Sequence, residues 1–333
     1  MKLLRFGPVG LEKTGILDAD GQVRDLSAHV PDLAGPAVAL EALNKIRAID
    51  VTTLPIVTDP GRMGPCLSWV PNFFCIGLNY ALHAKESGMD APSEPIIFSK
   101  ATSALSGPND DVIIPRASVK GDWEVELGVV IGKTALYVSE EDALDYVAGY
   151  CTINDVSERS FQTERGGQWI KGKSAPTFGP TGPWLVTADE VADPQKLDLS
   201  LSLNGETVQN SNTDDMIFGV AEIIAYMSNF MKLMPGDIIA TGTPSGVGLG
   251  MKPPRFLKPG VAEHPQGGGR GLEQLFAFQR QAERTPVAAE EPDTKLLFQK
   301  LDLLADRRGR DRQFLRRAGD GAAPRHGFEI EET

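Results

Sequence analysis

The sequence predicts an α+β fold that is rich in β-strands, in which a small N-terminal α+β unit precedes a larger domain. Short apolar or alternating runs recur between turn signals, and few segments have the spacing of a helix. A cluster of Pro and Gly near residue 60 separates the two parts. The chain has 333 residues, 41% of them hydrophobic, which is enough for a large core.

The small N-terminal unit is expected to span residues 1–65. Short strands are predicted at residues 3–6, 14–18 and 22–26, with the turn sequence DADG between the last two. Residues 37–48 have the helical spacing of Ala, Leu and Ile. The linker that follows is marked by Pro55, Pro60, Gly61, Gly64 and Pro65.

The main domain is expected to span residues 70–260. Strands are predicted within residues 73–80, 95–100, 111–115, 123–132 and 238–248, and the last of these enters a glycine-rich loop. Helices are predicted at residues 81–88, at the start of 139–155, where a strand follows, and at 219–237, where Pro235 and Gly236 end the helix. Residues 197–209 alternate in polarity around Asn204-Gly205, which predicts a hairpin.

Composition excludes several classes of partner. The formal net charge of −12 argues against nucleic acid, because phosphate binding needs clustered Lys and Arg. No run of about 18 apolar residues predicts a membrane span, and the start has no apolar segment of a signal peptide. The three cysteines have no metal-type spacing, so we expect a protein of the reducing cytoplasm.

An unusual set of acids lies at the predicted strand of residues 123–132, one directly before it and two within it. Asp122, Glu124 and Glu126 alternate with apolar residues, so they would share one face of a strand. Like charges on one face repel each other, which leaves two interpretations. Either the face is an exposed rim where water screens the charges, or a divalent cation such as Mg²⁺ or Ca²⁺ binds the carboxylates.

Other polar residues favour the second interpretation. Asp155 ends a buried apolar run, where an acid is unusual, and Arg159 and Gln162 follow it at helical spacing. Lys171 and Lys173 suit an anionic substrate held beside the metal. His83 and Glu86 lie three residues apart on one helical face, and a carboxylate that fixes an imidazole raises its basicity, as a general base requires.

With these residues the chain resembles the fumarylacetoacetate hydrolase family over about residues 70–260, and within it the ureidoglycolate lyase and acylpyruvate hydrolase-like subgroup. The matching segments, in order, are IGLNYALHAKE, PIIFSK, GPNDDVIIP, DWEVELGVVIG, YVAGYCTINDVSERSFQ, KGKS, FGPTGPWL and PGDIIATGTPSGVG. The resemblance implies a mixed β-sandwich roll with the small N-terminal unit.

The resemblance also implies a role for each site residue. Glu124, Glu126 and Asp155 match the ligands of Mg²⁺ or Mn²⁺, and His83, Glu86 and Lys173 match the catalytic residues. The substrate-binding positions are matched by Tyr80, Lys100, Arg159, Gln162 and Thr243. Asp122 is not a ligand by this comparison.

The activity implied is that of a divalent-metal-dependent hydrolase or lyase. It would cleave a C–C or C–N bond in a small 2-oxo or 2-hydroxy acid of the acylpyruvate or ureidoglycolate type. The alternatives are an isomerase or decarboxylase of aromatic catabolism in the same family, or a catalytically impaired member. A homodimer is expected, with no membrane or nucleic-acid partner.

Three departures from the family pattern bear on that alternative. Leu78 stands where many members have Arg, and Ala175-Pro176 follows KGKS. After Gly260 the alternating strand that usually ends the domain is absent from the pattern, and residues 261–333 have the Arg-rich composition of a disordered tail. We hypothesise that this last segment is read in a shifted frame.

Overall fold

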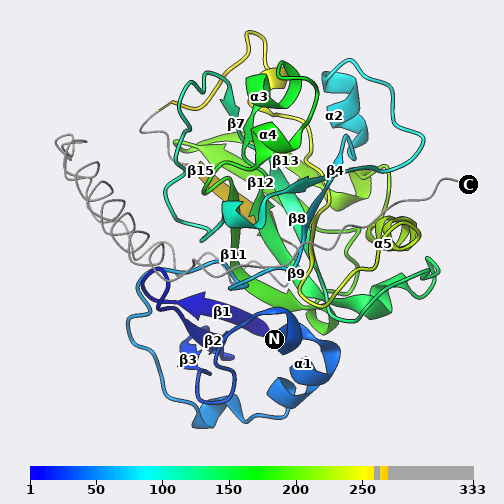
Figure 1. The fold of residues 1–333 in the computed structure, drawn as a ribbon. Coiled ribbons are helices and arrows are strands. Elements are labelled where there is room, and N and C mark those ends of the chain that lie inside the picture. The colour runs from blue at the N-terminus through cyan, green and yellow to red at the C-terminus, as the bar shows by residue number, and fades with distance from the viewer. Residues whose placement is uncertain (259–262, 269–333) are drawn as a thin grey trace, which may run out of the picture. The chain divides into compact units, whose positions relative to one another are not determined.

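The structure is a computed structural model, and it describes residues 1–258 and the strand Glu263–Gly268. Its main feature is a ten-stranded mixed sheet (Figure 1). The strands follow the order β3 (Val23–Asp25), β2 (Lys13–Leu17), β1 (Lys2–Phe6), β11 (Gly179–Thr187), β9 (Val147–Asn154), β8 (Val125–Ile131), β14 (Ile238–Ala240), β4 (Phe73–Gly77) and β5 (Ile96–Lys100), with β6 (Leu105–Ser106) beside β11. The pairs β14–β4 and β11–β6 are parallel, and the other pairs are antiparallel.

Two smaller sheets and five α-helices complete the described part. The strands β7 (Gly121–Asp122) and β10 (Ser157–Glu158) pair, and β12 (Asp198–Leu203) lies between β13 (Glu206–Asn212) and β15 (Glu263–Gly268). The helices are α1 (Leu40–Arg47), α2 (Ala81–Glu86), α3 (Arg159–Thr163), α4 (Ile170–Lys173) and α5 (Val220–Ser228). The β-rich α+β fold class predicted from the sequence is confirmed.

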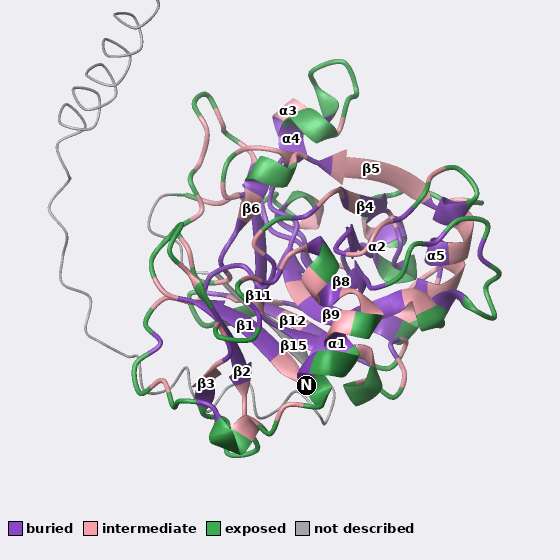
Figure 2. Ribbon diagram, turned by 60° about the horizontal axis from the view of Figure 1, so that its bottom comes forward, coloured by how far each residue is buried: buried purple, intermediate pink, exposed green. Residues whose placement is uncertain are grey.

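The central strands are buried on both faces (Figure 2). On one face Val130 packs in a cluster with residues of the N-terminal segment, such as Leu43 of α1. On the other face Val129 and Ile131 pack in a cluster with Ile224 of α5. Because successive side chains of a strand point to opposite faces, this double burial explains the continuous apolar run in β8.

Most predicted elements are present, and the hairpin is confirmed. Asn204 and Gly205 both have positive φ, at 50° and 83°, as a type I′ turn requires. Residues 111–115 form no strand, and the helix predicted to reach Pro235 ends at Ser228. The helix predicted before β9 is a single 3-10 turn, Ala143–Tyr146.

The two ends of the described part bear on the predicted N-terminal unit and on the predicted absence of a terminal strand. Strand β1 pairs with β11, so the strands of residues 1–65 extend the main sheet, and the division at residue 65 stays a prediction. The sequence pattern predicted no terminal strand after Gly260, and this prediction is wrong. Strand β15 is present and pairs with β12 over Glu263–Gly268, because backbone hydrogen bonds do not require alternating side chains. The rest of the predicted tail, residues 269–333, lies outside the described residues, and so does the frame hypothesis.

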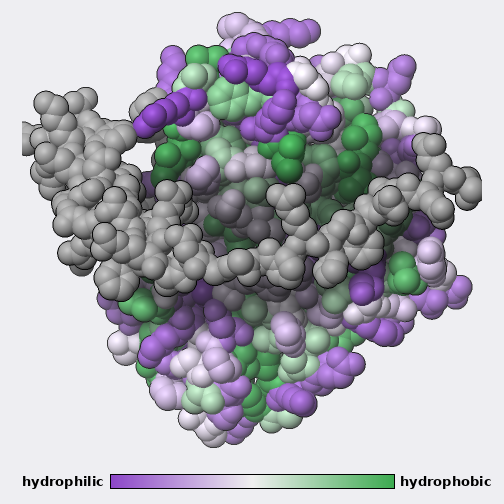
Figure 3. All heavy atoms as spheres, viewed as in Figure 1, coloured by the Kyte–Doolittle hydropathy of each residue, from purple (hydrophilic) through white to green (hydrophobic). Residues whose placement is uncertain are grey.

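No helix in the described part of the chain is long and apolar enough to cross a membrane. The described surface in Figure 3 mixes polar and apolar side chains over the main domain.

Candidate functional site

Three carboxylates meet where β8 begins and β9 ends. Glu124 directly precedes β8, Glu126 is its second residue, and Asp155 directly follows β9. The backbone N–H of Asp155 donates to the carbonyl oxygen of Glu124 at 2.8 Å, which places the two residues side by side. One oxygen of each carboxylate lies within 4.8 Å of the others, and all three residues are buried. The predicted ligand set is therefore brought together.

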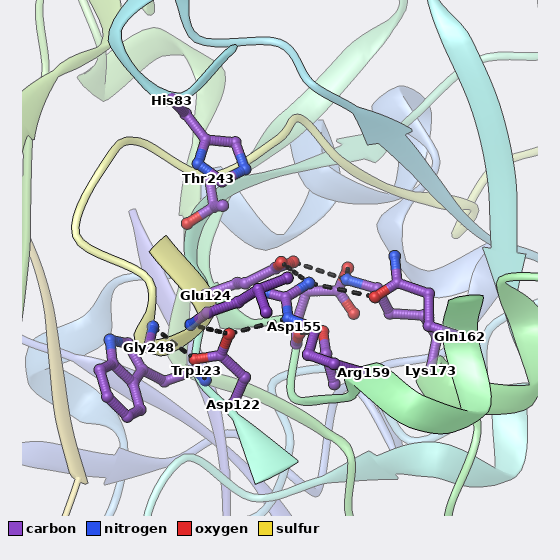
Figure 4. A network of polar contacts seen from close by, with 12 residues as sticks. His83, Asp122, Trp123, Glu124, Asp155, Arg159, Gln162, Lys173, Thr243 and Gly248 are labelled. Atoms are coloured by element: carbon purple, nitrogen blue, oxygen red, sulfur yellow. Dashed lines mark hydrogen bonds and ion pairs between the residues drawn. The ribbon is translucent and has the colours of Figure 1, made fainter. Parts of the chain in front are cut away.

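Three basic side chains surround this cluster, and Figure 4 shows two of them, Arg159 and Lys173. The Nζ of Lys173 lies 2.6 Å from Glu124 Oε2 and 2.7 Å from Asp155 Oδ2. Arg159 Nη1 lies 2.6 Å from Glu124 Oε1. Lys100 pairs with the other oxygen of Asp155 and donates to the carbonyl of Val156 at 3.1 Å. The acids and their basic partners are almost fully buried, so the ion pairs compensate most of the charge that burial would otherwise leave unpaired.

The environment drives the pKa values of the two glutamates apart. Burial raises the pKa of Glu124, but the charges of Arg159 and Lys173 more than offset this and lower it to about 2. Burial, together with the charges of Asp155 and Glu124, raises the pKa of Glu126 well above its usual value. Glu126 accepts from the backbone N–H of Gly242 at 2.8 Å but forms no ion pair with any residue in the described part of the chain.

The difference between the paired Glu124 and the unpaired Glu126 bears on whether these residues suit a metal ion. Three carboxylate oxygens in a buried cluster are the donor set that Mg²⁺ and Mn²⁺ prefer. Glu126 carries the one carboxylate of the three that lacks a cationic partner among the described residues, so a divalent cation would compensate it. The donor set therefore fits a divalent metal.

Lys173 and Arg159, the two basic side chains paired with Glu124, have pKa values that favour their charged forms. Burial lowers the pKa of Lys173, but Asp155 and Glu124 raise it more, to above its usual value. The pKa of Arg159 is likewise raised, because Glu124 and Asp122 outweigh the effect of burial. The Nη2 of Arg159 is buried and has no hydrogen-bond partner among the described residues, although Arg159 lines the pocket. A buried guanidinium N–H without a partner is a binding point for an anion.

His83 and Glu86 lie on α2 at the pocket wall. His83 Nδ1 is 3.3 Å from Glu86 Oε2, and Glu86 accepts from the backbone N–H of Gly246 at 3.0 Å. The glycine-rich loop thus fixes the carboxylate that orients the imidazole. No side chain fits at Gly246, since a Cβ there would lie 2.0 Å from the carbonyl oxygen of Val208.

Asp122 has a different function from its two neighbours in the acidic run. The run does not form one strand, because Asp122 lies in β7 and β8 begins at Val125. Its carboxylate accepts from the backbone N–H groups of Trp123, Gly248 and Leu249 at 2.9, 2.7 and 3.0 Å. It also accepts from Arg159 Nε at 2.8 Å. Asp122 therefore fixes both Arg159 and the turn at the pocket mouth, and only the break in the strand could have revealed this.

The site opens into a pocket of about 480 Å³. The predicted residues on its wall are His83, Glu86, Glu124, Glu126, Arg159, Gln162, Lys173 and Thr243. A volume of this size suits a small organic ligand. Its apolar wall, which includes Leu78, Phe98 and Trp169, was not predicted as part of the site.

Two predicted substrate contacts, Tyr80 and Lys100, lie deeper in the protein, whereas Thr243 lies on the pocket wall. Tyr80 packs in an apolar cluster with Trp123 and Val125, and Lys100 binds Asp155 from behind the pocket wall. The Thr243 hydroxyl donates to the carbonyl of Val125 at 2.9 Å and accepts from Gln209 at 2.8 Å. The substrate roles of these residues stay predictions.

Comparison with known proteins identifies the class to which this arrangement belongs. The family model described as fumarylacetoacetate (FAA) hydrolase C-terminal matches residues 72–262. A protein of Burkholderia ambifaria (strain MC40-6), provisionally named a hydrolase, is 62% identical over 261 residues, which are 78% of this chain and 93% of that relative.

Solved structures share the fold. A fumarylacetoacetate hydrolase from Exiguobacterium antarcticum matches with a TM-score of 0.70 and 35% identity, over 81% of this chain and 96% of that one. A maleylpyruvate hydrolase from Sphingobium sp. SYK-6, solved with manganese(II) and pyruvate, matches with a TM-score of 0.65 and 30% identity, over 80% and 95%.

The fold and the site thus define a β-rich protein with a buried acidic triad suited to a divalent metal ion. The chain belongs to the fumarylacetoacetate hydrolase family.

The charge balance predicts the behaviour of Glu126→Gln. Because the folded-state pKa of Glu126 is raised, the metal-free protein loses stability as pH rises above the ordinary value of 4.5. Glutamine keeps an acceptor for Gly242 and removes the charge, so metal-free E126Q should be more stable than the wild type at pH 8. Mn²⁺ at about 100 times its Kd should add about 2.7 kcal/mol to the wild type only. Thermal unfolding with and without Mn²⁺ measures both, and an equal Mn²⁺ effect in E126Q would contradict the ligand assignment.

A second prediction concerns Asp122→Asn. The amide NH₂ would face two donors, Arg159 Nε and the N–H of Leu249, so we expect a loss of about 2–4 kcal/mol in the free energy of unfolding. Released Arg159 should also raise KM about tenfold. Asp110→Asn is the matched control, since Asp110 pairs with Arg62 at 2.6 Å outside the pocket. If D110N changes KM as much as D122N does, general destabilisation explains the effect.

Proposed function

We propose that the chain is a divalent-metal-dependent hydrolase or lyase of a small 2-oxo or 2-hydroxy acid, of the acylpyruvate or ureidoglycolate type. The observation that carries the proposal is the buried triad beside Arg159, a residue of the pocket wall whose Nη2 has no hydrogen-bond partner among the described residues. The manganese and pyruvate held by the related maleylpyruvate hydrolase support it, because pyruvate is itself a 2-oxo acid.

The charges at the centre favour an anionic substrate. Four carboxylates, including that of Asp122, face Lys100, Arg159 and Lys173, which leaves one negative charge when all are ionised. A divalent cation held by Glu124, Glu126 and Asp155 would make the sum positive and would supply Lewis acidity toward the substrate's oxygens. Arg159 Nη2 would then bind a carboxylate oxygen.

His83 would move the proton. Glu86 would accept from Nδ1 and so select the tautomer in which Nε2 is the basic nitrogen. In hydrolysis Nε2 would take a proton from water as the water oxygen bonds to the acyl carbon. The C–C bond would then break, the acyl part would leave as a carboxylic acid, and the carbanion of the pyruvate part would take the proton from the imidazolium. In a lyase Nε2 would take the proton of the substrate hydroxyl as the C–N bond breaks and urea leaves. The same base serves both reactions.

Lys173 would act through its charge. Despite burial, its pKa is raised by the charges of Asp155 and Glu124, and its Nζ lies 2.6 Å from Glu124 Oε2 and 2.7 Å from Asp155 Oδ2, so we propose that it acts as an ammonium cation. With Gln162 on the same wall, it would stabilise negative charge that develops on substrate oxygen.

An isomerase is the second candidate. A 2-hydroxyhepta-2,4-diene-1,7-dioate isomerase from Mycobacterium marinum shares the fold with a TM-score of 0.61 and 28% identity, over 81% of this chain and 94% of that one. Proton transfer by His83 without attack by water would give isomerisation.

We also propose a homodimer, for which light scattering of the purified protein is the test.

Turnover separates these activities. Chelator-treated protein, resupplied with Mg²⁺ or Mn²⁺, should consume acetylpyruvate if it is a hydrolase and release urea from ureidoglycolate if it is a lyase. Conversion of the dienoic diacid without cleavage would select the isomerase. Metal binding without turnover of any of the three would overturn the proposal.

His83→Ala should lower kcat by about 10²–10⁴-fold, because the general base is lost. Mn²⁺ affinity should stay within about twofold, since His83 is not among the three proposed ligands. Kinetics and Mn²⁺ titration measure the two effects, with the exposed His29→Ala as control. Equal losses of activity and metal affinity would show that His83 is a ligand or a structural residue.

A further inference from the structure

We infer that the pocket selects 2-oxo acids with an uncharged, apolar tail, an inference that rests on the proposed function. The metal centre and Arg159 would take the acid head, and an apolar wall leads away from them. The residues that form this wall are Leu78, Met89, Phe98, Trp169, Leu249 and Met251.

The aromatic part of the wall is continuous with the charged centre. Lys173 Nζ lies 5.2 Å from the centroid of the Phe98 ring, and Phe98 meets Trp169 edge to face at 5.2 Å and 67°. Trp169 packs directly on Gly77, where a Cβ would lie 2.4 Å from the indole. The absence of a side chain at Gly77 thus lets the indole extend the wall outward from Lys173.

Leu78 directly follows Gly77 at the end of β4 and adds to this wall. It has a φ of 52°, in the left-handed region that a branched residue rarely adopts, and it lines the pocket. Such backbone strain is typical of residues held for function. A strained leucine that contacts the pocket contributes an apolar surface there and no charge.

The charged residues of the pocket wall do not offer a second anion site at depth. Lys173 and Arg159 are engaged with the triad, and Glu86 is negative. Lys252 is the remaining Lys or Arg of the wall among the described residues, and it is exposed. Water would screen its charge, so it would compensate a second carboxylate weakly. A terminal carboxylate would otherwise lose its hydration against Leu78 and Trp169.

The test compares ligands of matched length on the Mn²⁺-loaded full chain. Calorimetry with pyruvate, 2-oxohexanoate and 2-oxoadipate should show 2-oxohexanoate binding at least about tenfold tighter than pyruvate, since each buried methylene contributes roughly fourfold. 2-Oxoadipate, in which a carboxylate replaces the terminal methyl of 2-oxohexanoate, should bind at least about tenfold more weakly than 2-oxohexanoate.

Variants then locate the effect. Leu78→Arg should reduce or reverse the preference for 2-oxohexanoate over 2-oxoadipate, and Leu78→Ala should reduce the gain over pyruvate. Leu82→Ala is the matched control, because Leu82 lies on the nearby α2, is exposed and is absent from the pocket wall. Retained pyruvate binding shows that a variant is folded.

The outcomes separate the inference from the proposed function. If pyruvate binds but 2-oxohexanoate gains nothing, the inference is wrong and the proposed function stands. If 2-oxoadipate binds more tightly than 2-oxohexanoate and Lys252→Ala abolishes this, the pocket is one for diacids and the inference is wrong. If pyruvate itself does not bind the Mn²⁺-loaded protein, the proposed function fails and the inference fails with it.

Discussion

The pairing of buried charges around Asp155 is the constraint on which the site depends. Lys173 bridges Asp155 and Glu124, and Lys100 binds the other oxygen of Asp155 from inside the fold. An unpaired charge at this depth would be strongly destabilising, so these ion pairs fix the ends of β8 and β9 and the short helix α4. The centre therefore has a stable arrangement of its own, in which Glu126 is the one acid left for an added cation to compensate.

The sequence predicted much of this centre because its chemistry is local. Glu124 and Glu126 lie two residues apart, His83 and Glu86 lie three apart, and turn signals such as Asn204-Gly205 depend on adjacent residues. The fold class and most strands of the main sheet follow from the same short-range patterns. The family resemblance then joined segments that are distant in the chain.

What the sequence did not predict depends on contacts between distant segments. Spacing placed Asp122 with Glu124 and Glu126, but pairing of β7 with β10 breaks the strand and turns Asp122 toward Gly248 and Leu249. The helix α5 ends at Ser228, whose hydroxyl accepts from the N–H of Val138 rather than continuing a helical pattern. Strand β15 forms on β12 through its backbone, for which the side-chain pattern carried no signal.

The placement of Trp169 and Lys173 at the two ends of α4 has a mechanical consequence. Trp169 precedes the first residue of this single helical turn, and Lys173 is its last residue. A ligand that packs on the indole at one end would lie within one helical turn of the ammonium at the other, and the Phe98 ring contacts both side chains. Substrate length would then influence the orientation of the reacting end as well as the strength of binding.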